Sequence, residues 1–302
     1  MSLNFRQLEI VRAVSRYGSV TAAASALGIS QPAVSMTLRD CSRVAGFPLF
    51  LRKQGRLQPT METSELLGDL ERVFNGVDRI NRLLDDMRDI KVGTIQIAAT
   101  PTLADNLLPR AIASFKKTRP NVQITISTMD NINVLNHVVQ EHVDFGMVLS
   151  PTTRFDTRPM ELCAADLICV VHPDHPLARK GAVTPEDLAP HPLISFSRSL
   201  PLGALVEQGF RKAGVPRRIT LEVNQSSVAC ALARAGAGVA IIDPFWLLDQ
   251  RDHGVVRLQF RPRTRVTAEV LLPNGANPSR PARLLMAAIR GTATSLKRAG
   301  AF

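Results

Sequence analysis

Segment 30–39 carries three polar side chains at a regular spacing. Gln31, Ser35 and Arg39 stand four residues apart, so on a helix they share one face. Amide, hydroxyl and guanidinium groups bind the edges of bases in the major groove. We therefore predict contacts with double-stranded DNA, by these residues and by others near them in the sequence. The full predicted set is Thr21, Ser30, Gln31, Pro32, Ser35, Met36, Arg39, Arg52 and Arg56.

Two predicted helices position these side chains. The first, 19–27, ends at Gly28, which readily adopts the left-handed conformation of a helix end. In the second, Ser30 suits the N-cap and Pro32 lies in the first turn, where its missing N–H costs little. Two helices joined by a tight glycine turn form a helix-turn-helix, whose second helix enters a major groove. A plain helical hairpin is the alternative interpretation.

The segment that follows favours DNA over a plain hairpin. Residues 46–60 predict two short strands around a basic, glycine-containing turn, which together form a wing. Arg52 and Arg56 lie there, and guanidinium groups contact phosphates or enter a narrow minor groove. Residues 1–60 hold eight basic and only two acidic residues. We therefore predict a winged helix-turn-helix domain over 1–60.

Segment 61–91 predicts a dimerising linker helix. Its hydrophobic residues recur at alternating steps of four and three, which is the pattern of a coiled-coil seam. Charged residues occupy the other faces, and the segment contains no proline. The alternative is that the helix packs on its own domain. A homodimer would let two wings and two recognition helices read two half-sites. The predicted seam is Leu66, Leu70, Val73, Val77, Ile80, Leu84 and Met87.

From residue 92 onward, predicted strands alternate with predicted helices. This order indicates parallel sheets covered by helices, in two α/β lobes. We assign 92–163 and 267–302 to lobe I and 164–266 to lobe II, with a proline- and arginine-rich crossover at 261–265. Ligands of such sheets bind at the carboxyl ends of the strands. The predicted ligand-contacting residues at these ends are Thr100, Pro101, Thr102, Thr128, Leu149, Ser195, Ser197 and Asn224.

Composition supports a regulator of nucleic acid. The net charge of +11 favours a polyanionic partner. The longest apolar stretches are far too short to span a bilayer, and the amino terminus lacks the apolar core of a signal peptide, so we expect a cytoplasmic protein without membrane contact. Residues 251–302 hold ten basic and two acidic residues. This segment is either a solvated face or a contact surface for RNA polymerase.

The sequence gives no support for a metal, a cofactor or catalysis. The four cysteines form no Cys-x-x-Cys pair, and the six histidines are scattered. No Gly-x-Ser-x-Gly, Gly-x-Gly-x-x-Gly or P-loop signature occurs. Gly236-Ala237-Gly238 precedes a predicted strand rather than a helix, so it is a poor phosphate cradle. An enzyme built on the α/β portion, or a pure solute-binding module, is the less favoured alternative.

The chain resembles the LysR-type transcriptional regulators. The N-terminal residues that carry the resemblance are Phe5-Arg6-Gln7-Leu8, Thr21-Ala22-Ala23-Ala24 with Leu27, Ser30-Gln31-Pro32-Ala33-Val34-Ser35, and Pro48-Leu49-Phe50 with Arg52. In the α/β portion they are Thr100-Pro101-Thr102-Leu103, Asp144-Phe145-Gly146, Val171-His172-Pro173-Asp174-His175-Pro176-Leu177 and Ala235-Gly236-Ala237-Gly238-Val239-Ala240. The resemblance implies an α/β fold class: a winged helix-turn-helix, a dimerising linker helix and a two-lobed, periplasmic-binding-protein-like effector domain.

Within the family, the chain looks most like the branch of the lysine-biosynthesis, octopine and nopaline regulators. The residues behind this likeness are 194–199, 217–223 and 241–244. The likeness implies a homodimer or homotetramer that binds an operator and is switched by a small carboxylate, amino-acid-like effector. Some members of the family instead switch by forming a disulfide, so a redox sensor using Cys163 and Cys169 is an alternative.

Overall fold

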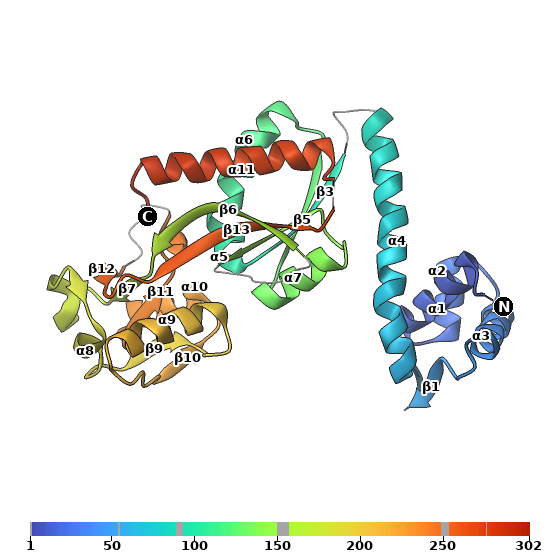
Figure 1. Cartoon of the computed structure of the whole chain (residues 1–302), viewed down its shortest axis with the longest axis horizontal. Coiled ribbons are helices and arrows are strands. Elements are labelled where there is room, and N and C mark those ends of the chain that lie inside the picture. The colour runs from blue at the N-terminus through green and yellow to red at the C-terminus, as the bar shows by residue number, and fades with distance from the viewer. Residues whose placement is uncertain (1, 54, 89–92, 150–156, 249–253, 276) are drawn as a thin grey trace. The chain divides into compact units, whose positions relative to one another are not determined.

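The protein divides into two compact units, which we describe separately (Figure 1). The first comprises Met1–Asn81 and the second Arg82–Phe302. A computed structural model describes residues 2–53, 55–88, 93–149, 157–248, 254–275 and 277–302.

The N-terminal unit is a winged helix-turn-helix followed by a long helix. Ser19 and Ser30 cap α2 and α3 by accepting hydrogen bonds from the N–H groups of Ala22 and Ala33. Gly28 then ends α2 in the left-handed conformation, with φ of 64°. The elements are α1 (Phe5–Tyr17), α2 (Val20–Leu27), α3 (Gln31–Ala45), β1 (Phe50–Lys53), β2 (Arg56–Pro59) and α4 (Met61–Arg88).

A small apolar core fixes the three short helices. Ala23 and Ala24 of α2 are buried together with Val14 of α1 and Val34 of α3. Because alanine has a short side chain, α2 comes close to both neighbours. The wing is tied to this core by a hydrogen bond of 2.9 Å from the Leu57 N–H to the Gly18 carbonyl. The recognition helix and the wing are therefore parts of one packed body.

Helix α4 packs on α1 through one face of its first half. Arg12 of α1 forms an ion pair of 2.7 Å with Glu71, and its guanidinium also lies over the ring of Phe74. The ring of Phe5 packs on Phe74 at a centroid distance of 4.5 Å. Leu70 and Phe74 are buried in the single chain. This face of α4 is therefore occupied by the chain's own DNA-binding domain.

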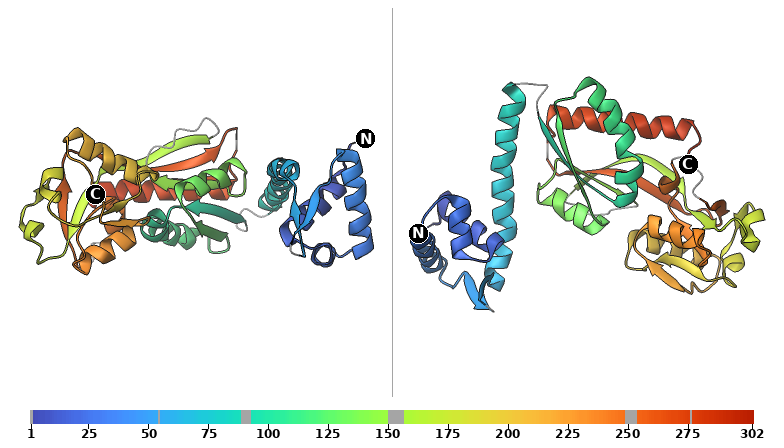
Figure 2. Two further views of the ribbon diagram at one scale, coloured as in Figure 1. Left: turned by 90° about the horizontal axis from the view of Figure 1, so that it is seen from below. Right: turned by 180° about the vertical axis from the view of Figure 1, so that it is seen from behind.

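The second unit contains two sheets, one in each lobe (Figures 1 and 2). The sheet of lobe I has the order β4-β3-β5-β13-β6, and that of lobe II has the order β10-β9-β11-β7-β12-β8. The strands of lobe I are β3 (Thr94–Ala99), β4 (Gln123–Thr128), β5 (Phe145–Leu149), β6 (Thr157–Asp166) and β13 (Arg265–Pro273). Those of lobe II are β7 (Ile168–Val171), β8 (Ala182–Val183), β9 (Leu193–Phe196), β10 (Leu221–Val223), β11 (Val239–Ile242) and β12 (Val256–Phe260).

Helices connect these strands and cover the sheets. In lobe I they are α5 (Pro101–Asn106), α6 (Leu108–Thr118), α7 (Asn131–Val139) and α11 (Arg280–Arg298). Lobe II contains η1 (Pro176–Arg179), α8 (Pro185–Leu188), α9 (Pro201–Lys212), α10 (Ser226–Arg234) and η2 (Pro244–Leu247). In the described part of the chain, no helix is long and apolar enough to cross a bilayer.

Both sheets are mixed, whereas the alternation of strands and helices predicted parallel sheets. In lobe I, β3 pairs in parallel with β4 and β5, but β13 runs antiparallel to β5 and β6. The strand β6 was missed because it contains Pro159 and several charged residues and lies at the sheet edge, where such residues are tolerated. Its pairing with β13 also places 164–166 and 265–266 in lobe I, which shifts the predicted lobe boundary.

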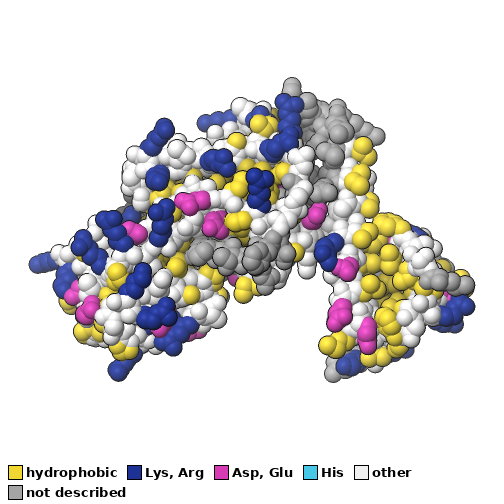
Figure 3. Space-filling model, in the orientation of Figure 1, with side chains coloured by type: hydrophobic (Ala, Val, Ile, Leu, Met, Phe, Trp, Pro, Cys, Tyr) yellow, Lys and Arg dark blue, Asp and Glu magenta, His cyan; other side chains and the backbone are white. Residues whose placement is uncertain are grey.

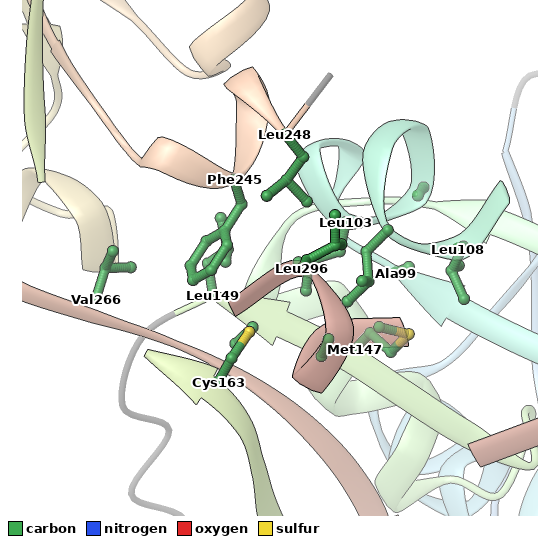
Figure 4. Close-up of a cluster of buried hydrophobic side chains, with 14 of the residues drawn as sticks. Ala99, Leu103, Leu108, Met147, Leu149, Cys163, Phe245, Leu248, Val266 and Leu296 are labelled. Atoms are coloured by element: carbon green, nitrogen blue, oxygen red, sulfur yellow. The ribbon is translucent and has the colours of Figure 1, made fainter. Parts of the chain in front are cut away.

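The two lobes share one apolar core. Phe245 of η2 and Leu248 just after it belong to the same buried cluster as Leu103 and Leu149 of lobe I. Figure 4 shows these side chains among the residues of that cluster. Two chain segments join the lobes, at Leu167 and at 261–264, and the Leu167 N–H donates a hydrogen bond of 2.8 Å to the Thr264 carbonyl. The two connecting segments are therefore hydrogen-bonded to each other beside the shared core.

Candidate DNA interface and interlobe cavity

The outer face of α3 carries most of the predicted base-contacting side chains. Gln31, Met36 and Arg39 are exposed, and Ser35 is half-buried. The Gln31 side-chain amide donates a hydrogen bond of 3.0 Å to the Ser35 hydroxyl. Met36 on the same face is 63% exposed. The face thus offers hydrogen-bonding groups and an apolar group together.

The other predicted DNA contacts surround this face. Ser30 and Pro32 are exposed at the start of α3, and Thr21 is exposed at the start of α2. Arg52 on β1 and Arg56 on β2 are exposed on the wing. The following guanidinium groups form no ion pair with any described residue: Arg39, Arg52 and Arg56. Their charge is available to a polyanion.

The second unit contains a cavity between its lobes, with a volume of about 90 Å³. Since one water needs roughly 10–15 Å³ of such space, the cavity holds several waters or one small solute. It is lined from lobe I by Thr100, Pro101, Thr102, Asp130, Asn131 and Leu149. From lobe II it is lined by Phe196, Leu200, Pro201, Leu202, Asn224, Gln225, Ser226 and Asp243.

Four helices begin at this cavity: α5, α7, α9 and α10. The first N–H groups of a helix have no carbonyl partner within it, and its N-terminus carries partial positive charge. The N-cap residues Thr100, Leu200 and Gln225 make no side-chain capping bond. The Thr100 hydroxyl is buried and has no hydrogen-bond partner among the described residues. At the starts of α5, α9 and α10 the cavity wall therefore presents backbone N–H groups that no N-cap side chain binds, whereas α7 is capped by Asp130.

Asp243 connects the lobes across the cavity wall. It lies at the end of β11 in lobe II and is completely buried. Its Oδ2 atom accepts a hydrogen bond of 2.5 Å from the Ser226 hydroxyl and a longer one of 3.4 Å from the Thr102 hydroxyl of lobe I. Burial raises the pKa of Asp243 to about 6, although these hydroxyls and the backbone at Trp246 and Asp243 favour the charged form. Asp243 is not among the eight residues predicted to contact the ligand.

Arg217 holds the loop that forms the lobe II wall. Its side chain is fully buried and donates hydrogen bonds to the carbonyls of Phe196, at 3.2 Å, and Gly203, at 2.8 Å. Glu207 balances its charge at 2.9 Å. A Cβ atom at Gly203 would lie 1.8 Å from the Ser197 carbonyl oxygen, so only glycine fits there. Arg217 and Gly203 thus fix the loop between β9 and α9.

Three residues predicted to contact the ligand do not line the cavity. Thr128 is exposed at the end of the edge strand β4. Ser195 is completely buried, because side chains alternate along β9 and its neighbour Phe196 lines the cavity instead. Ser197 is half-buried, and its hydroxyl accepts a hydrogen bond from Ser199. The other five predicted residues, Thr100, Pro101, Thr102, Leu149 and Asn224, do line it.

Comparison with known proteins identifies the two units. Residues 5–63 match the family described as bacterial regulatory helix-turn-helix protein, lysR family. Residues 89–294 match the LysR substrate binding domain, which covers more than half of the chain.

The chain belongs to the LysR family.

Individual relatives agree with this assignment over nearly the whole chain. The transcriptional activator protein LysR of Escherichia coli is 32% identical over 272 residues, covering 90% of this chain and 88% of the relative. The octopine catabolism/uptake operon regulatory protein OccR of Rhizobium meliloti is 32% identical, covering 84% of each chain. The structure of full-length CbnR complexed with its target DNA has a TM-score of 0.71 at 21% identity, covering 96% of this chain and 100% of that one.

This LysR-family protein is therefore a DNA-binding transcriptional regulator with an effector-binding domain. The family consists of transcription regulators and not of enzymes, so the enzyme alternative is dropped. The predicted fold class and the predicted resemblance to the lysine and octopine regulators are both confirmed. Among the described residues, no group of three or more histidine, cysteine or acidic side chains could hold a metal ion.

The exposed apolar side chains of α4 occupy only part of the predicted dimer seam. Val73, Ile80 and Leu84 are 49%, 57% and 49% exposed, whereas Leu70 is buried in its own chain. Leu66 and Val77 are half-buried, and the side chain of Met87 lies outside the described residues. Figure 3 shows hydrophobic side chains on the surface of α4. The helix therefore packs on its own domain with one face and exposes a second apolar stripe.

The two candidate redox cysteines lie in different sheets. Cys163 is on β6 of lobe I and Cys169 on β7 of lobe II. Burial raises the pKa of both thiols to about 12, with the Glu161 carboxylate adding to the effect at Cys163. Since the thiolate is the form that oxidants attack, both groups are inert at neutral pH. Figure 4 shows Cys163 among the apolar side chains of the core. The structure gives the redox alternative no support.

The basic C-terminal helix presents its charges to solvent. Arg283, Arg290 and Lys297 of α11 are exposed, while Leu285 and Ile289 on the opposite face are buried. Figure 3 shows Lys and Arg side chains spread over the visible face of this unit. The basic face is solvated, and contact with RNA polymerase stays a prediction.

Proposed function

We propose that this regulator binds its operator as a homodimer and is switched by a small, amino-acid-like carboxylate in the interlobe cavity. The recognition helix α3 and the wing read the DNA, and the effector changes the relative arrangement of the two lobes. A ligand acts on such an equilibrium only through different affinities for the two arrangements, usually with a coupling of about 1–3 kcal/mol.

The observation that carries the effector assignment is the convergence of four helix N-termini on one small cavity. Backbone N–H groups and partial positive charge at helix starts bind carboxylates without a basic side chain. None of the described residues that line this cavity is lysine, arginine or histidine, so these N–H groups and the Thr100 hydroxyl would bind the anion. The name of OccR refers to octopine catabolism and uptake, which fits an amino-acid-like effector for this chain.

The first prediction tests the DNA-contacting face. Replacing Arg39 by alanine should weaken binding to DNA selected by the wild-type protein from a random library by about 1–3 kcal/mol, because a base-reading guanidinium is lost. Binding should also fall steeply with salt, since phosphate contacts release counterions. Arg290→Ala removes the same charge from α11 and should change the binding constant little. A binding constant insensitive to both Arg39→Ala and salt would place the interface elsewhere.

The second prediction tests the cavity. Thermal-shift and calorimetric titrations with the standard amino acids and small carboxylates should give at least one compound that binds the effector unit. Thr100→Val should then weaken binding of that compound about tenfold, because the lost hydroxyl has no hydrogen-bond partner among the described residues and can bind a ligand. Ser197→Ala is the matched control, since this nearby hydroxyl does not line the cavity. Equal affinities for Thr100→Val and wild type would rule out this cavity as the carboxylate site.

A further inference from the structure

One group in the interlobe cavity is not explained by recognition of a carboxylate. Asp243 lines the cavity and is completely buried. Its Oδ2 atom is held by the hydroxyls of Ser226 and Thr102, but its Oδ1 atom has no hydrogen-bond partner in the described parts of the chain. The backbone at Trp246 in η2 favours the charged form of Asp243, but no N–H at the start of η2 makes a capping hydrogen bond to the side chain. An ionised carboxylate only accepts hydrogen bonds, so Oδ1 can accept one from a donor beyond the described residues.

Among the described residues that line the cavity with Asp243, none has a positive side chain. Asp130 is the other charged residue of this described lining. Its carboxylate already accepts hydrogen bonds from the Asn133 N–H, at 2.9 Å, and from the Asn133 side-chain amide, at 2.8 Å. Buried charges in proteins are normally paired with an opposite charge. Asp243 is therefore a buried acceptor without a counter-ion among the described lining residues, whereas Asp130 is a satisfied helix cap.

We propose that Asp243 is the counter-ion of an ammonium group on the effector. The cavity then selects compounds that carry both an amine and a carboxylate over plain carboxylates. The carboxylate lies at the helix N-termini and the ammonium group at Oδ1 of Asp243. This inference rests on the proposed function, because it concerns the same ligand in the same cavity.

The hydrogen bonds of Asp243 also explain how such a ligand affects both lobes. Ser226 and Asp243 belong to lobe II, and Thr102 belongs to lobe I. The 3.4 Å contact between Thr102 and Asp243 is long for a hydrogen bond to a carboxylate. An ammonium group has three donors, so it can bind Asp243 and accepting oxygens of lobe I together. The amine therefore favours the arrangement in which the two lobes are close.

Four five-carbon probes separate the contributions of amine and carboxylate. Pentanoate carries no amine, and 5-aminopentanoate carries a terminal amine. L-norvaline carries an α-amine, and L-ornithine carries both an α-amine and a terminal amine. Binding to the full-length protein is measured by calorimetry, for wild type and Asp243→Asn. We expect the best amino compound to bind wild type about 10- to 100-fold more tightly than pentanoate, as a charge-assisted hydrogen bond requires. In Asp243→Asn this ratio should fall close to one, with pentanoate binding unchanged or tighter.

A matched variant shows that the effect is specific. Asp174→Asn makes the same change on an exposed loop of lobe II, away from the cavity lining, and should keep the ratio. The fold of each variant is checked by circular dichroism.

The outcomes separate this inference from the proposed function. If wild type binds pentanoate as tightly as the amino compounds, or if Asp243→Asn keeps the preference, Asp243 is not an ammonium site and the carboxylate site still stands. If none of the four probes binds wild type, the proposed carboxylate site and the ammonium site both fail. A preference that is lost in Asp243→Asn and kept in Asp174→Asn supports the inference.

Discussion

Replacing Ile80 and Leu84 of α4 by aspartate should convert the regulator into a monomer. Both side chains are about half exposed in the single chain and lie on the stripe that is not used by the chain's own domain. If this stripe forms the dimer seam, each aspartate would bury a charge against the partner helix, which is costly without a counter-charge. Sedimentation analysis should then show one chain per particle, where the wild type shows at least two.

The same double variant should lose most of its affinity for the operator. A dimer binds two half-sites at once, and such linkage commonly strengthens binding by about 10²–10⁴. We therefore expect operator affinity to fall by about 100-fold or more. Arg72→Glu is the matched control, because it makes the same change in net charge on the exposed face that pairs with Asp69. A variant that stays dimeric would move the interface away from α4.

Replacing Asp243 by asparagine should stabilise the effector-binding unit at neutral pH. The pKa of Asp243 is raised to about 6 by burial, from an ordinary value of 3.8. The folded state therefore holds the proton more tightly than the unfolded state, and the wild type loses stability as pH rises from about 4 to about 6. Above this window the loss reaches about 3 kcal/mol, since each pKa unit corresponds to 1.36 kcal/mol.

Urea unfolding at about pH 4.5 and about pH 7.5 checks this expectation. At the higher pH, Asp243→Asn should be more stable than wild type, and at the lower pH the difference should be much smaller. Asparagine can still accept the hydrogen bond from the Ser226 hydroxyl, so the change removes charge with little loss of packing. Equal stability of wild type and variant at both pH values would show that the buried charge of Asp243 does not destabilise the free protein. The expected gain also means that a bound ammonium group would stabilise the wild type, by supplying the missing counter-charge.

The local structure of the DNA-binding domain could be predicted because its signals lie within a few residues of one another. Ser30 caps the helix that follows it, and Gly28 ends the helix before it. The exposed face of α3 follows from the helical repeat alone. The alternation of strands and helices in the second unit was equally local, so most of its elements could be placed from the sequence.

The cavity depended on contacts that no local pattern encodes. Thr102 and Asp243 are 141 residues apart, yet they meet across the two lobes. Which of Ser195 and Phe196 lines the cavity depends on the face that β9 turns toward it. Five of the eight predicted ligand-contacting residues line the cavity, at the carboxyl ends of β3, β5 and β10. Thr128 and Ser197 lie at the ends of β4 and β9 and do not line it, so a place at the end of a strand was not enough to predict contact with the cavity.

The family, the helix-turn-helix, the wing and the alternating α/β pattern could all be predicted from the sequence, because periodicity and capping are properties of neighbouring residues. Two features required the folded structure: β13 runs antiparallel in its sheet, and Leu70 packs inside its own chain while Ile80 stays exposed. The folded structure also shows Asp243 as a buried carboxylate without a counter-ion among the described lining residues. Burial and missing partners depend on every element packed around a group, and this packing is not contained in any single segment of the chain.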